Sequence, residues 1–515
     1  MERRDRQEPD RAPVLPLSSA PVSNGEFIPD PPTPIDAEIE KATLDLVDAA
    51  ARRRNVDRRE FLQTAGGVVA ALTVLNACSG GSKSGRSPER RGTSTVSPSS
   101  GGFTVPPTEN VEACARELGN QGEFIFDVHT HHVIPDGPWR QNAPETVQLV
   151  LGMLPADCHA ADPLECVNRA AYLHDLFLAS DTTVAMLSDV PNSGPADAAV
   201  PFPDAVGTRQ LATELTRAGA PRVLVQNVVA PNFGPLAARL DEMTANASTR
   251  DVAAFKVYTA YGPNRQGFAL DDPKIGLPVL QHAHDLGVKT FIAHKGLPLV
   301  RFDLSHNGPD DVVAVSRQFR DMQFVIFHAA WEKDHVEGPY DPTSRRGVDA
   351  VLAALDRHQV PPNDNVWVDL ATLWRVLLTR PMQAAHAVGK LLKRVGTDRV
   401  LWGTDSVWYG SPQPQIMAFR AFQIGTQLQE QFGYPALTDD IKRKVFGLNA
   451  ARLFGIDPAA KRCALASDPL ATAKPAAAHL REDGALPSAW APRGPTSRRE
   501  MLQWLTSPTT RWTPA

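Results

Sequence analysis

The first half of the chain contains the segment Phe124-Ile125-Phe126-Asp127-Val128-His129-Thr130-His131. Its apolar start is typical of a buried strand, and its polar end carries two histidines separated by one residue. Because side chains alternate between the two faces of a strand, His129 and His131 point the same way, about 6.5 Å apart along the backbone. Two imidazoles placed in this way can bind one divalent ion, whereas His132 is expected to face away from them.

Four later segments have the same form, a short apolar run followed by a polar side chain. The polar residues are Lys256 after Ala253-Ala254-Phe255, His294 after Phe291-Ile292-Ala293, His328 after Phe324-Val325-Ile326-Phe327, and Asp405 after Val400-Leu401-Trp402-Gly403-Thr404. If these runs are parallel strands of one sheet, their polar ends meet at the same edge. The five segments together therefore predict one polar site built from distant parts of the chain.

Strand patterns occur eight times in the central part of the chain, with amphipathic segments between them. They cover residues 124–129, 183–189, 222–229, 252–258, 288–294, 323–328, 365–370 and 399–404. From the second pattern on, successive starts are about 30–40 residues apart, which is the length of one βα unit. The sequence predicts an α/β fold, a (β/α)8 TIM barrel, with its active site at the C-terminal ends of the strands.

The flanks differ from the barrel in composition. The barrel is expected to occupy residues 109–465, before which residues 79–108 are rich in Ser, Gly, Pro and Arg and predict a flexible linker. Residues 1–57 are rich in Pro and acidic groups, which predicts a disordered extension with one helix near residues 36–54. Residues 466–515 are an Ala/Pro-rich tail with a short amphipathic helix expected at 496–506.

Residues 58–78 resemble a twin-arginine export signal. Asp57-Arg58-Arg59-Glu60-Phe61-Leu62-Gln63 precedes the weakly apolar run 65–77, and Leu75-Asn76-Ala77-Cys78 looks like a lipoprotein processing box. We expect export by the twin-arginine machinery to the cell envelope, the periplasm or the exterior, with Cys78 as the lipidation site. The alternatives are ordinary signal cleavage, a retained N-terminal anchor, or a short buried helix.

Composition limits the partners. The formal net charge is −5, and we find no basic stripe with interleaved aromatic residues, which argues against nucleic acid as a partner. No stretch reaches the roughly 20 apolar residues that a membrane span needs, so membrane contact is expected only through a lipid anchor or a retained signal. Cys158 and Cys166 could form a disulfide after export, or remain thiols. A small-molecule substrate is expected, and an oligomer is compatible with the sequence.

The chain resembles the metal-dependent amidohydrolase superfamily over roughly residues 120–456, in particular its amidohydrolase-related branch. The resemblance rests on His129-Thr130-His131, His294, His328, Gly403-Thr404-Asp405-Ser406 and the closing run from Gly447 to Gly455. It implies that His129, His131, His294 and Asp405 bind one divalent cation, with zinc as the first choice. Such a metal lowers the pKa of its bound water to about 7. Asp405 would accept the proton of that water, and His328 would polarise the substrate carbonyl or bind a second metal ion.

Lys256 decides between one metal ion and two. Its segment Phe255-Lys256-Val257-Tyr258 resembles the segment of hydantoinases and dihydropyrimidinases in which a carboxylated lysine bridges two metals. The alternative is a protonated Lys256 that orients substrate or pairs with an acid such as Asp405. Both arrangements stay open from the sequence.

Several residues near the predicted strand ends could contact substrate. The aromatic candidates are Tyr258, Tyr261, Trp331, Trp374, Trp402 and Trp408, of which Tyr258, Trp331 and Trp408 are preferred. Packing between helices and barrel is the alternative for each of them. The cationic candidates for a substrate carboxylate are Lys295, Arg301 and Arg375. Asp369, at the end of the seventh strand, could orient a histidine ligand or make a purely structural hydrogen bond.

The resemblance leaves three functional readings. The first is a hydrolase that uses metal-activated water to attack an amide, a lactone or ester, or a C–C bond next to a carbonyl. The second is a metal-dependent decarboxylase of an aromatic or unsaturated acid, since the same branch includes enzymes similar to aminocarboxymuconate semialdehyde decarboxylase. The third, a tethered binding lipoprotein on an inactive barrel, is disfavoured because all the expected ligands are present.

Overall fold

The structure is a computed structural model of the chain that describes residues 15–19, 22–23, 29–79, 93–152, 160–216, 220–297, 302–465, 468–482 and 499. Its centre is an eight-stranded parallel sheet in which each strand pairs with the next one along the chain. The strands are β2 (Phe126–Thr130), β3 (Val184–Leu187), β4 (Val223–Val228), β5 (Val252–Tyr258), β6 (Thr290–His294), β7 (Gln323–Phe327), β8 (Val366–Asp369) and β9 (Val400–Leu401). Seven of the eight lie within the segments that the sequence pattern predicts, and β2 extends one residue beyond its segment 124–129.

The sheet closes on itself between its first and last strands. β9 is short, and the residues that follow it complete the closure: the Trp402 carbonyl accepts from the Val128 N–H at 3.0 Å, and the Asp405 N–H donates to the His129 carbonyl at 2.8 Å. Thr130 and Ser406 form a parallel bridge one residue further along. The predicted (β/α)8 barrel is therefore confirmed, with its closing seam between β2 and residues 402–407.

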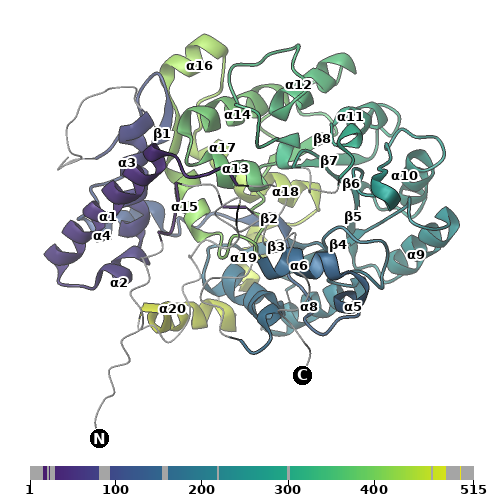
Figure 1. Cartoon of the computed structure of the whole chain (residues 1–515), viewed down its shortest axis with the longest axis horizontal. Coiled ribbons are helices and arrows are strands. Elements are labelled where there is room, and N and C mark those ends of the chain that lie inside the picture. The colour runs from purple at the N-terminus through teal and green to yellow at the C-terminus, as the bar shows by residue number, and fades with distance from the viewer. Residues whose placement is uncertain are drawn as a thin grey trace, which may run out of the picture.

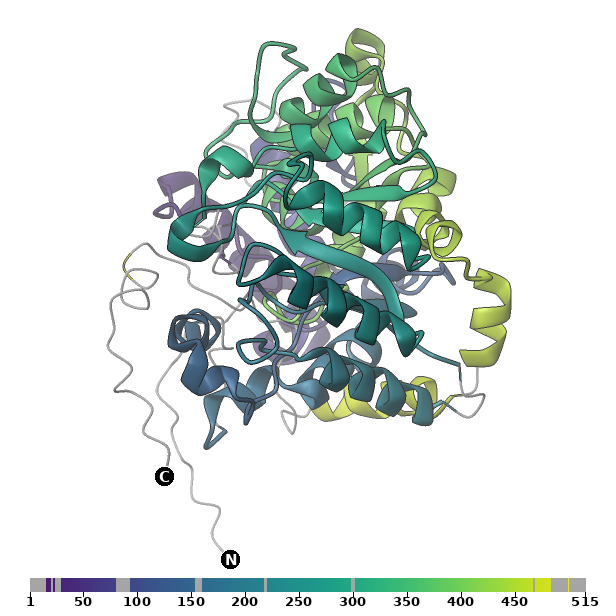
Figure 2. The same cartoon turned by 90° about the vertical axis from the view of Figure 1, so that its right-hand side faces the viewer.

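Helices surround the barrel (Figures 1 and 2). Those of the barrel and the segment after it are α5 (Trp139–Asn142), α6 (Pro144–Gly152), α7 (Arg169–Leu173), α8 (Phe202–Glu214), α9 (Leu236–Ser248), α10 (Gly276–Asp285), α11 (Asp310–Ser316), α12 (Gly347–Arg357), α13 (Ala371–Leu377), α14 (Pro381–Arg394), α15 (Gln413–Ala421), α16 (Thr426–Phe432), α17 (Asp439–Arg443), α18 (Asn449–Leu453), α19 (Pro458–Leu465) and α20 (Pro469–Glu482). α17 continues through a π-helical turn, Lys444–Leu448, into α18. The Thr438 hydroxyl caps the start of α17 by accepting from the Ile441 N–H.

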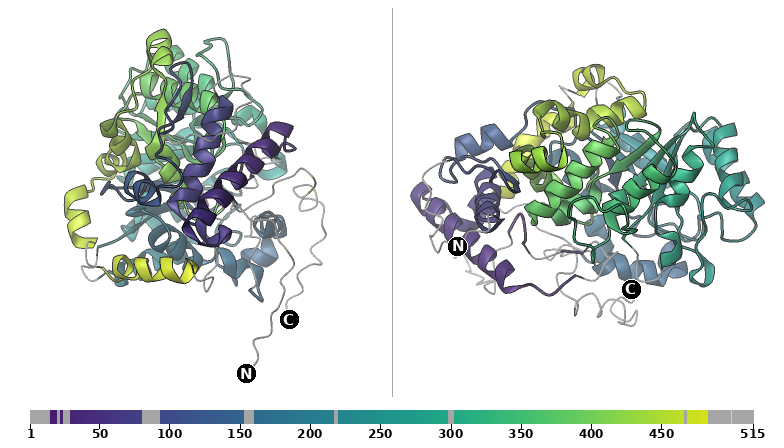
Figure 3. Two further views of the ribbon diagram at one scale, coloured as in Figure 1. Left: turned by 90° about the vertical axis from the view of Figure 1, so that its left-hand side faces the viewer. Right: turned by 90° about the horizontal axis from the view of Figure 1, so that it is seen from above.

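The N-terminal helices pack on one side of the barrel (Figures 1 and 3). They are α1 (Pro34–Arg54), α2 (Arg58–Leu62), α3 (Ala65–Ser79) and α4 (Val111–Leu118). The helix expected near residues 36–54 is α1, which starts with a capping box between Thr33 and Asp36. Asp36 also forms an ion pair with Arg380 at 3.0 Å. The predicted disorder of residues 1–57 does not extend to residues 34–54, because capping and apolar contacts hold them on the barrel.

α3 contains the apolar run that resembles a signal segment, and it lies in the core. Val68, Val69, Ala70 and Leu72 are fully buried, and the helix packs against α1, α4, α15 and β1 (Gly101–Phe103). Burying each large aliphatic side chain contributes about 1.5–3 kcal/mol. α3 therefore has the position that the buried-helix alternative describes, while export and lipidation stay predictions. None of the helices in the described part of the chain combines the length and apolarity of a membrane span.

Asn76 joins α3 to the first strand. Its side-chain amide donates to the Phe103 carbonyl at 2.5 Å and accepts from the Phe103 N–H at 2.7 Å, as a neighbouring strand would. On its other side β1 pairs with β10 (Phe422–Ile424) in antiparallel register. Ser94 and Val105 form a further antiparallel bridge. The predicted flexible linker 79–108 is thus ordered over residues 93–108, because backbone pairing, which composition does not reveal, holds it.

The cysteines divide into two groups. Cys78 and Cys463 are exposed free thiols, and Cys114 is a buried one. Cys166 takes part in a disulfide. Cys158, its predicted partner, lies outside the described residues, as does the helix expected at 496–506 apart from residue 499.

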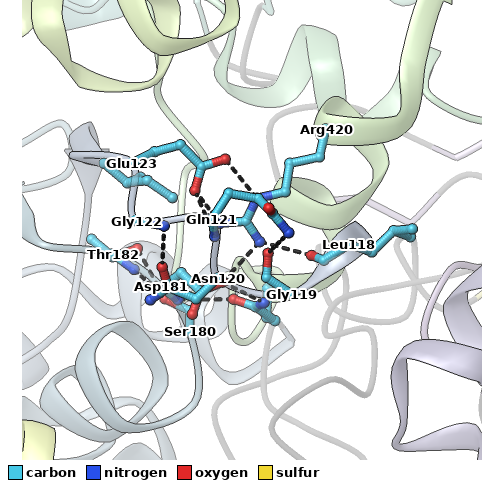
Figure 4. Close-up of polar contacts among 12 residues, drawn as sticks. Leu118, Gly119, Asn120, Gln121, Gly122, Glu123, Ser180, Asp181, Thr182 and Arg420 are labelled. Atoms are coloured by element: carbon cyan, nitrogen blue, oxygen red, sulfur yellow. Dashed lines mark hydrogen bonds and ion pairs between the residues drawn. The ribbon is translucent and has the colours of Figure 1, made fainter. Parts of the chain in front are cut away.

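A buried ion cluster ties helices to the N-terminal ends of the strands (Figure 4). Arg420 of α15 makes a two-pronged contact with Glu123 at 3.0 and 2.9 Å and a third contact with Asp181 at 2.8 Å. Lys474 of α20 reaches Asp181 at 2.9 Å. Glu123 precedes β2 and Asp181 precedes β3, so the cluster fixes the starts of two strands whose other ends carry the candidate site.

Replacing Asn76 by leucine should destabilise the protein. The variant leaves the N–H and C=O of Phe103 without partners, and an unsatisfied buried group costs about 1–3 kcal/mol. We expect a lower thermal midpoint in a calorimetric scan of Asn76→Leu. Asn142→Leu, which removes an exposed hydrogen bond to the Ala196 carbonyl, is the control. An equal fall of the thermal midpoint in both variants would contradict the stabilising role of the hydrogen bonds between Asn76 and Phe103.

Asp181 should make the protein sensitive to acid. Burial tends to raise the pKa of its carboxyl, but Lys474 and Arg420 outweigh burial and lower the pKa from 3.8 to about 2. The stabilisation, roughly 2 kcal/mol, is therefore present above about pH 4 and is lost as the pH falls toward 2. We expect the thermal midpoint to fall less between pH 6 and pH 3 in Asp181→Asn than in the wild type. Asp136→Asn, at an exposed position, should follow the wild type.

Candidate metal centre

The barrel brings the predicted polar residues together at the C-terminal ends of its strands. His129 lies in β2, Lys256 in β5 and His294 at the end of β6. His131 and His328 directly follow β2 and β7, and Asp405 lies in the closing seam. All six residues are at most 2 % exposed. The alternation of each strand directs them inward, and the seam between β2 and residues 402–407 sets Asp405 beside the two β2 histidines.

The side-chain atoms of Asp405, His131 and His129 are spaced like the ligand atoms of a zinc centre. The Asp405 Oδ1 atom lies 3.4 Å from His131 Nε2 and 3.6 Å from His129 Nε2. Tetrahedral zinc with bonds of about 2.1 Å holds its ligand atoms roughly 3.4 Å apart. His129, His131 and Asp405 also offer ligand atoms that all lie within 4.8 Å of one another. These donors, two imidazole nitrogens and one carboxylate oxygen, therefore fit a divalent ion.

His294 and His328 complete the group. The ring of His328 lies 4.8 Å from the rings of both His129 and His294, measured between centroids. Burial, followed by Lys256 and the neighbouring histidines, lowers the pKa of His129 well below its usual value. A neutral imidazole is the form that binds a metal ion, so this environment favours ligation over protonation.

Asp369 orients two of these residues. Its Oδ2 atom lies 2.9 Å from His129 Nδ1, and its Oδ1 atom accepts from the His328 N–H at 2.5 Å. A carboxylate behind a histidine fixes the ring so that the opposite nitrogen faces the metal. Asp369 has the position expected of a residue that orients a ligand.

The backbone is strained where two of these residues lie. His328, Ala329 and Ala330 have φ values of 58°, 48° and 52°, and Asp405 has a φ of 60°. Residues other than glycine rarely adopt this left-handed conformation, which costs about 1–3 kcal/mol at each position. Surrounding hydrogen bonds hold it here, including the one from the His328 N–H to Asp369. The strain supports a functional role for both turns.

Thr372 belongs to the site and Asp189 lies beside Tyr258, and neither was selected from the sequence. The Thr372 hydroxyl donates to Asp405 Oδ2 at 2.8 Å and so leaves Oδ1 facing the histidines. Asp189 follows β3, and burial raises its pKa to about 7. It lines a cavity of about 170 Å³ together with Gln226 and Asn246. The signal that could have identified both residues is their position one to three residues after a strand.

Lys256 points into the barrel and is fully buried. Its Nζ lies 4.6 Å from the ring centroids of both Tyr258 and Phe327, and the Phe327 ring stacks on His129 at 3.9 Å. The side chain therefore reaches the histidine cluster. A bridging carbamate and a protonated amine both remain compatible with this position.

The predicted substrate contacts fall into two groups. Trp408 stacks on His131 at 5.7 Å, and Tyr258 lies 5.0 Å from His294 while its hydroxyl donates to the Asp189 carbonyl. Trp331, Trp374 and Trp402 instead pack in the hydrophobic layer between barrel and helices. This is the packing role that the sequence left open for them.

The cationic candidates for a substrate carboxylate also differ in their surroundings. Lys295 pairs with Asp311 at 2.7 Å and donates to the His306 carbonyl, so its charge is already balanced. Arg301 lies outside the described residues. Arg375 is buried beside the ring of Tyr409. His132 faces away from the site as expected, and its ring contacts the Thr208 hydroxyl at 2.9 Å.

A protein-family model described as "Amidohydrolase" matches residues 126–456, which is more than half of the chain. The curated proteins contain no match.

Three similar solved structures each cover about two thirds of this chain and nearly all of their own. A probable 2-pyrone-4,6-dicarboxylic acid hydrolase from Acinetobacter baumannii is 14 % identical, with a TM-score of 0.37 and coverage of 64 % and 99 %. 5-Carboxyvanillate decarboxylase from Sphingomonas paucimobilis is 13 % identical, with a TM-score of 0.42 and coverage of 65 % and 100 %. An amidohydrolase from Burkholderia multivorans with bound zinc is 16 % identical, with a TM-score of 0.38 and coverage of 65 % and 100 %.

Loss of the Asp369 carboxylate should weaken metal binding. Residues that orient a histidine ligand typically contribute 10–100-fold to metal affinity, so we expect a loss of about that size in Asp369→Asn. Zinc competition against a chromophoric chelator measures the affinity, and metal analysis of the wild type gives the number of ions per chain. His132→Gln, beside the site but turned away from it, should keep wild-type affinity. Equal affinity in all three proteins would contradict the orienting role.

Proposed function

The chain belongs to the amidohydrolase family of enzymes, and we propose that it is a metal-dependent hydrolase of a small organic substrate. The bond that breaks lies next to a carbonyl and is an amide, a lactone or ester, or a C–C bond. The observation that carries this proposal is the approach of Asp405 to His131 and His129, at 3.4 and 3.6 Å, at the C-terminal face of the barrel. Active sites of this fold lie at that face.

His129, His131, His294 and Asp405 are the residues that would hold the divalent cation, for which zinc is our first choice. When bound, such an ion acts as a Lewis acid and makes water a nucleophile near neutral pH. Lys256, if carboxylated, and His328 would hold a second ion. One ion is our first assignment, since the Lys256 Nζ lies 4.6 Å from the ring centroids of Tyr258 and Phe327, a position that suits a cationic amine.

Asp405 is the group we assign to proton transfer. Thr372 fixes its Oδ2 atom by a hydrogen bond of 2.8 Å, and its Oδ1 atom faces the histidines. A carboxylate held in this way takes a proton from the attacking water and gives it to the leaving group. His328, whose N–H donates to Asp369, is placed to polarise the substrate carbonyl.

Decarboxylation of an aromatic or unsaturated acid is the second candidate. The same donor set serves both reactions, and one observation favours a carboxylic acid as substrate. Arg375 is a buried arginine close to the residues that hold Asp405. The two candidates differ in their product, since only the second releases carbon dioxide without consuming water.

A substrate panel with the zinc-loaded full chain tests the proposal. Amides, esters, lactones and aromatic acids are scored for both hydrolysis and carbon dioxide release. We expect hydrolysis, and we expect Asp405→Asn to lower its rate by about 10²–10⁴-fold, the usual contribution of general acid–base catalysis. Zinc content is measured in each sample, and Asp136→Asn is the control.

Carbon dioxide from an aromatic acid, without hydrolytic turnover, would replace the hydrolase assignment by the decarboxylase one. A full chain that takes up no divalent ion after reconstitution would contradict both.

A further inference from the structure

Arg375 lies one helical turn from a residue of the metal centre. It belongs to α13, three positions after Thr372, and residues three apart lie on the same side of a helix. The guanidinium carbon is 5.4 Å from the centroid of the Tyr409 ring. The Tyr409 hydroxyl lies 3.3 Å from the Thr372 hydroxyl, which in turn donates to Asp405 at 2.8 Å. A short series of contacts therefore connects Arg375 to Asp405.

The charge of Arg375 is buried without an anionic partner. The residue is 5 % exposed, and within the described ranges no carboxylate lies within ion-pair distance of its guanidinium. Burial lowers the pKa of Arg375, and Tyr409 opposes this effect. A guanidinium nevertheless stays protonated in a protein, so it remains a buried charge.

Several other buried cations among the described residues have an anionic partner. Lys295 pairs with Asp311 at 2.7 Å, Lys390 with Glu337 at 2.7 Å and Asp349 at 2.6 Å, and Arg222 with Asp468 at 2.6 Å. A buried charge without a partner is costly. The contrast indicates that Arg375 is kept for a partner from outside the chain.

We propose that Arg375 binds a carboxylate group of the substrate. This inference rests on the proposed function, because it places the carboxylate at one end of a molecule whose reacting carbonyl lies at the metal centre. The guanidinium presents a planar edge that matches a carboxylate in a two-pronged contact. One guanidinium also balances the single negative charge of a carboxylate, whereas a phosphate dianion would bring an uncompensated charge into the site.

Binding measurements with charged and neutral analogues test this assignment. Titration calorimetry on the zinc-loaded full chain compares benzoate with benzamide, succinate with succinamide, and inorganic phosphate. We expect at least one carboxylate to bind the wild type more tightly than its amide. In Arg375→Met this preference should fall about 30-fold or more, because truncating a buried charge contact typically costs at least about 2 kcal/mol. Any carboxylate contact with zinc remains in the variant, so the difference reports on Arg375.

Two further variants are compared with Arg375→Met. Arg375→Lys keeps the charge but not the two-pronged geometry and should retain part of the preference. Arg116→Gln, at an exposed arginine, should bind all probes as the wild type does. Without ligand, Arg375→Met should have an equal or higher thermal midpoint than the wild type, since it removes an unpaired buried charge. A purely structural arginine would give the opposite shift.

Three outcomes would overturn the inference. They are a wild type that favours no carboxylate over its amide or that favours phosphate, a preference that survives in Arg375→Met, and a midpoint that falls in both Arg375 variants. Zinc content and turnover are recorded on the same samples. Normal zinc and hydrolysis without a carboxylate preference would contradict only the role of Arg375. Absence of zinc would contradict the proposed function instead.

Discussion

The site depends on the closure of the barrel between its first and last strands. The hydrogen bonds from Val128 N–H to Trp402 and from Asp405 N–H to His129 join segments that are more than 270 residues apart in the sequence. Asp127 strengthens the seam by accepting from both the N–H and the hydroxyl of Thr404. Without this closure the β2 histidines would lack the carboxylate that lies 3.4 Å from one of them. Fold and candidate chemistry thus rest on the same few backbone contacts.

Much of this arrangement could be predicted from the sequence, because strand patterns and metal ligands depend on local order. The eight strands and the inward positions of His129 and His131 follow from alternation of side chains along β-structure. The orienting role of Asp369 also follows from its place at a strand end. Thr372 and Asp189 were not selected, because their position just after a strand is a weak signal until the partner of each side chain is known. For the aromatic residues too, position in the sequence does not distinguish a contact with the site from packing elsewhere. Trp408 contacts His131 while Trp331 packs outside the barrel, and both sit near strand ends in the sequence.

The N-terminal region shows where composition misleads. A Ser/Gly/Pro-rich stretch predicts a flexible linker, yet residues 101–103 form β1 because β10 and the Asn76 amide satisfy their backbone. The apolar run 65–77 has the length of a signal core, and a helix buried on all sides has the same composition. Periodicity cannot separate these cases. The two cases differ in whether other segments of the chain pack around the helix, and here α1, α4 and α15 pack against α3.

This burial has a consequence for the export hypothesis. Cleavage before Cys78 would remove α1 to α3, and with them Asn76 and the ion pair between Asp36 and Arg380. The edge of β1 that faces Asn76 would then lose its partners, as would the apolar side chains of α4 and α15 that pack on α3. A protein that carries its folded barrel across a membrane would have to keep α3 docked or compensate for this loss. The same residues cannot be both a fully exposed recognition signal and a core helix at one time. If the export hypothesis holds, recognition of these residues therefore precedes the docking of α3 on the barrel.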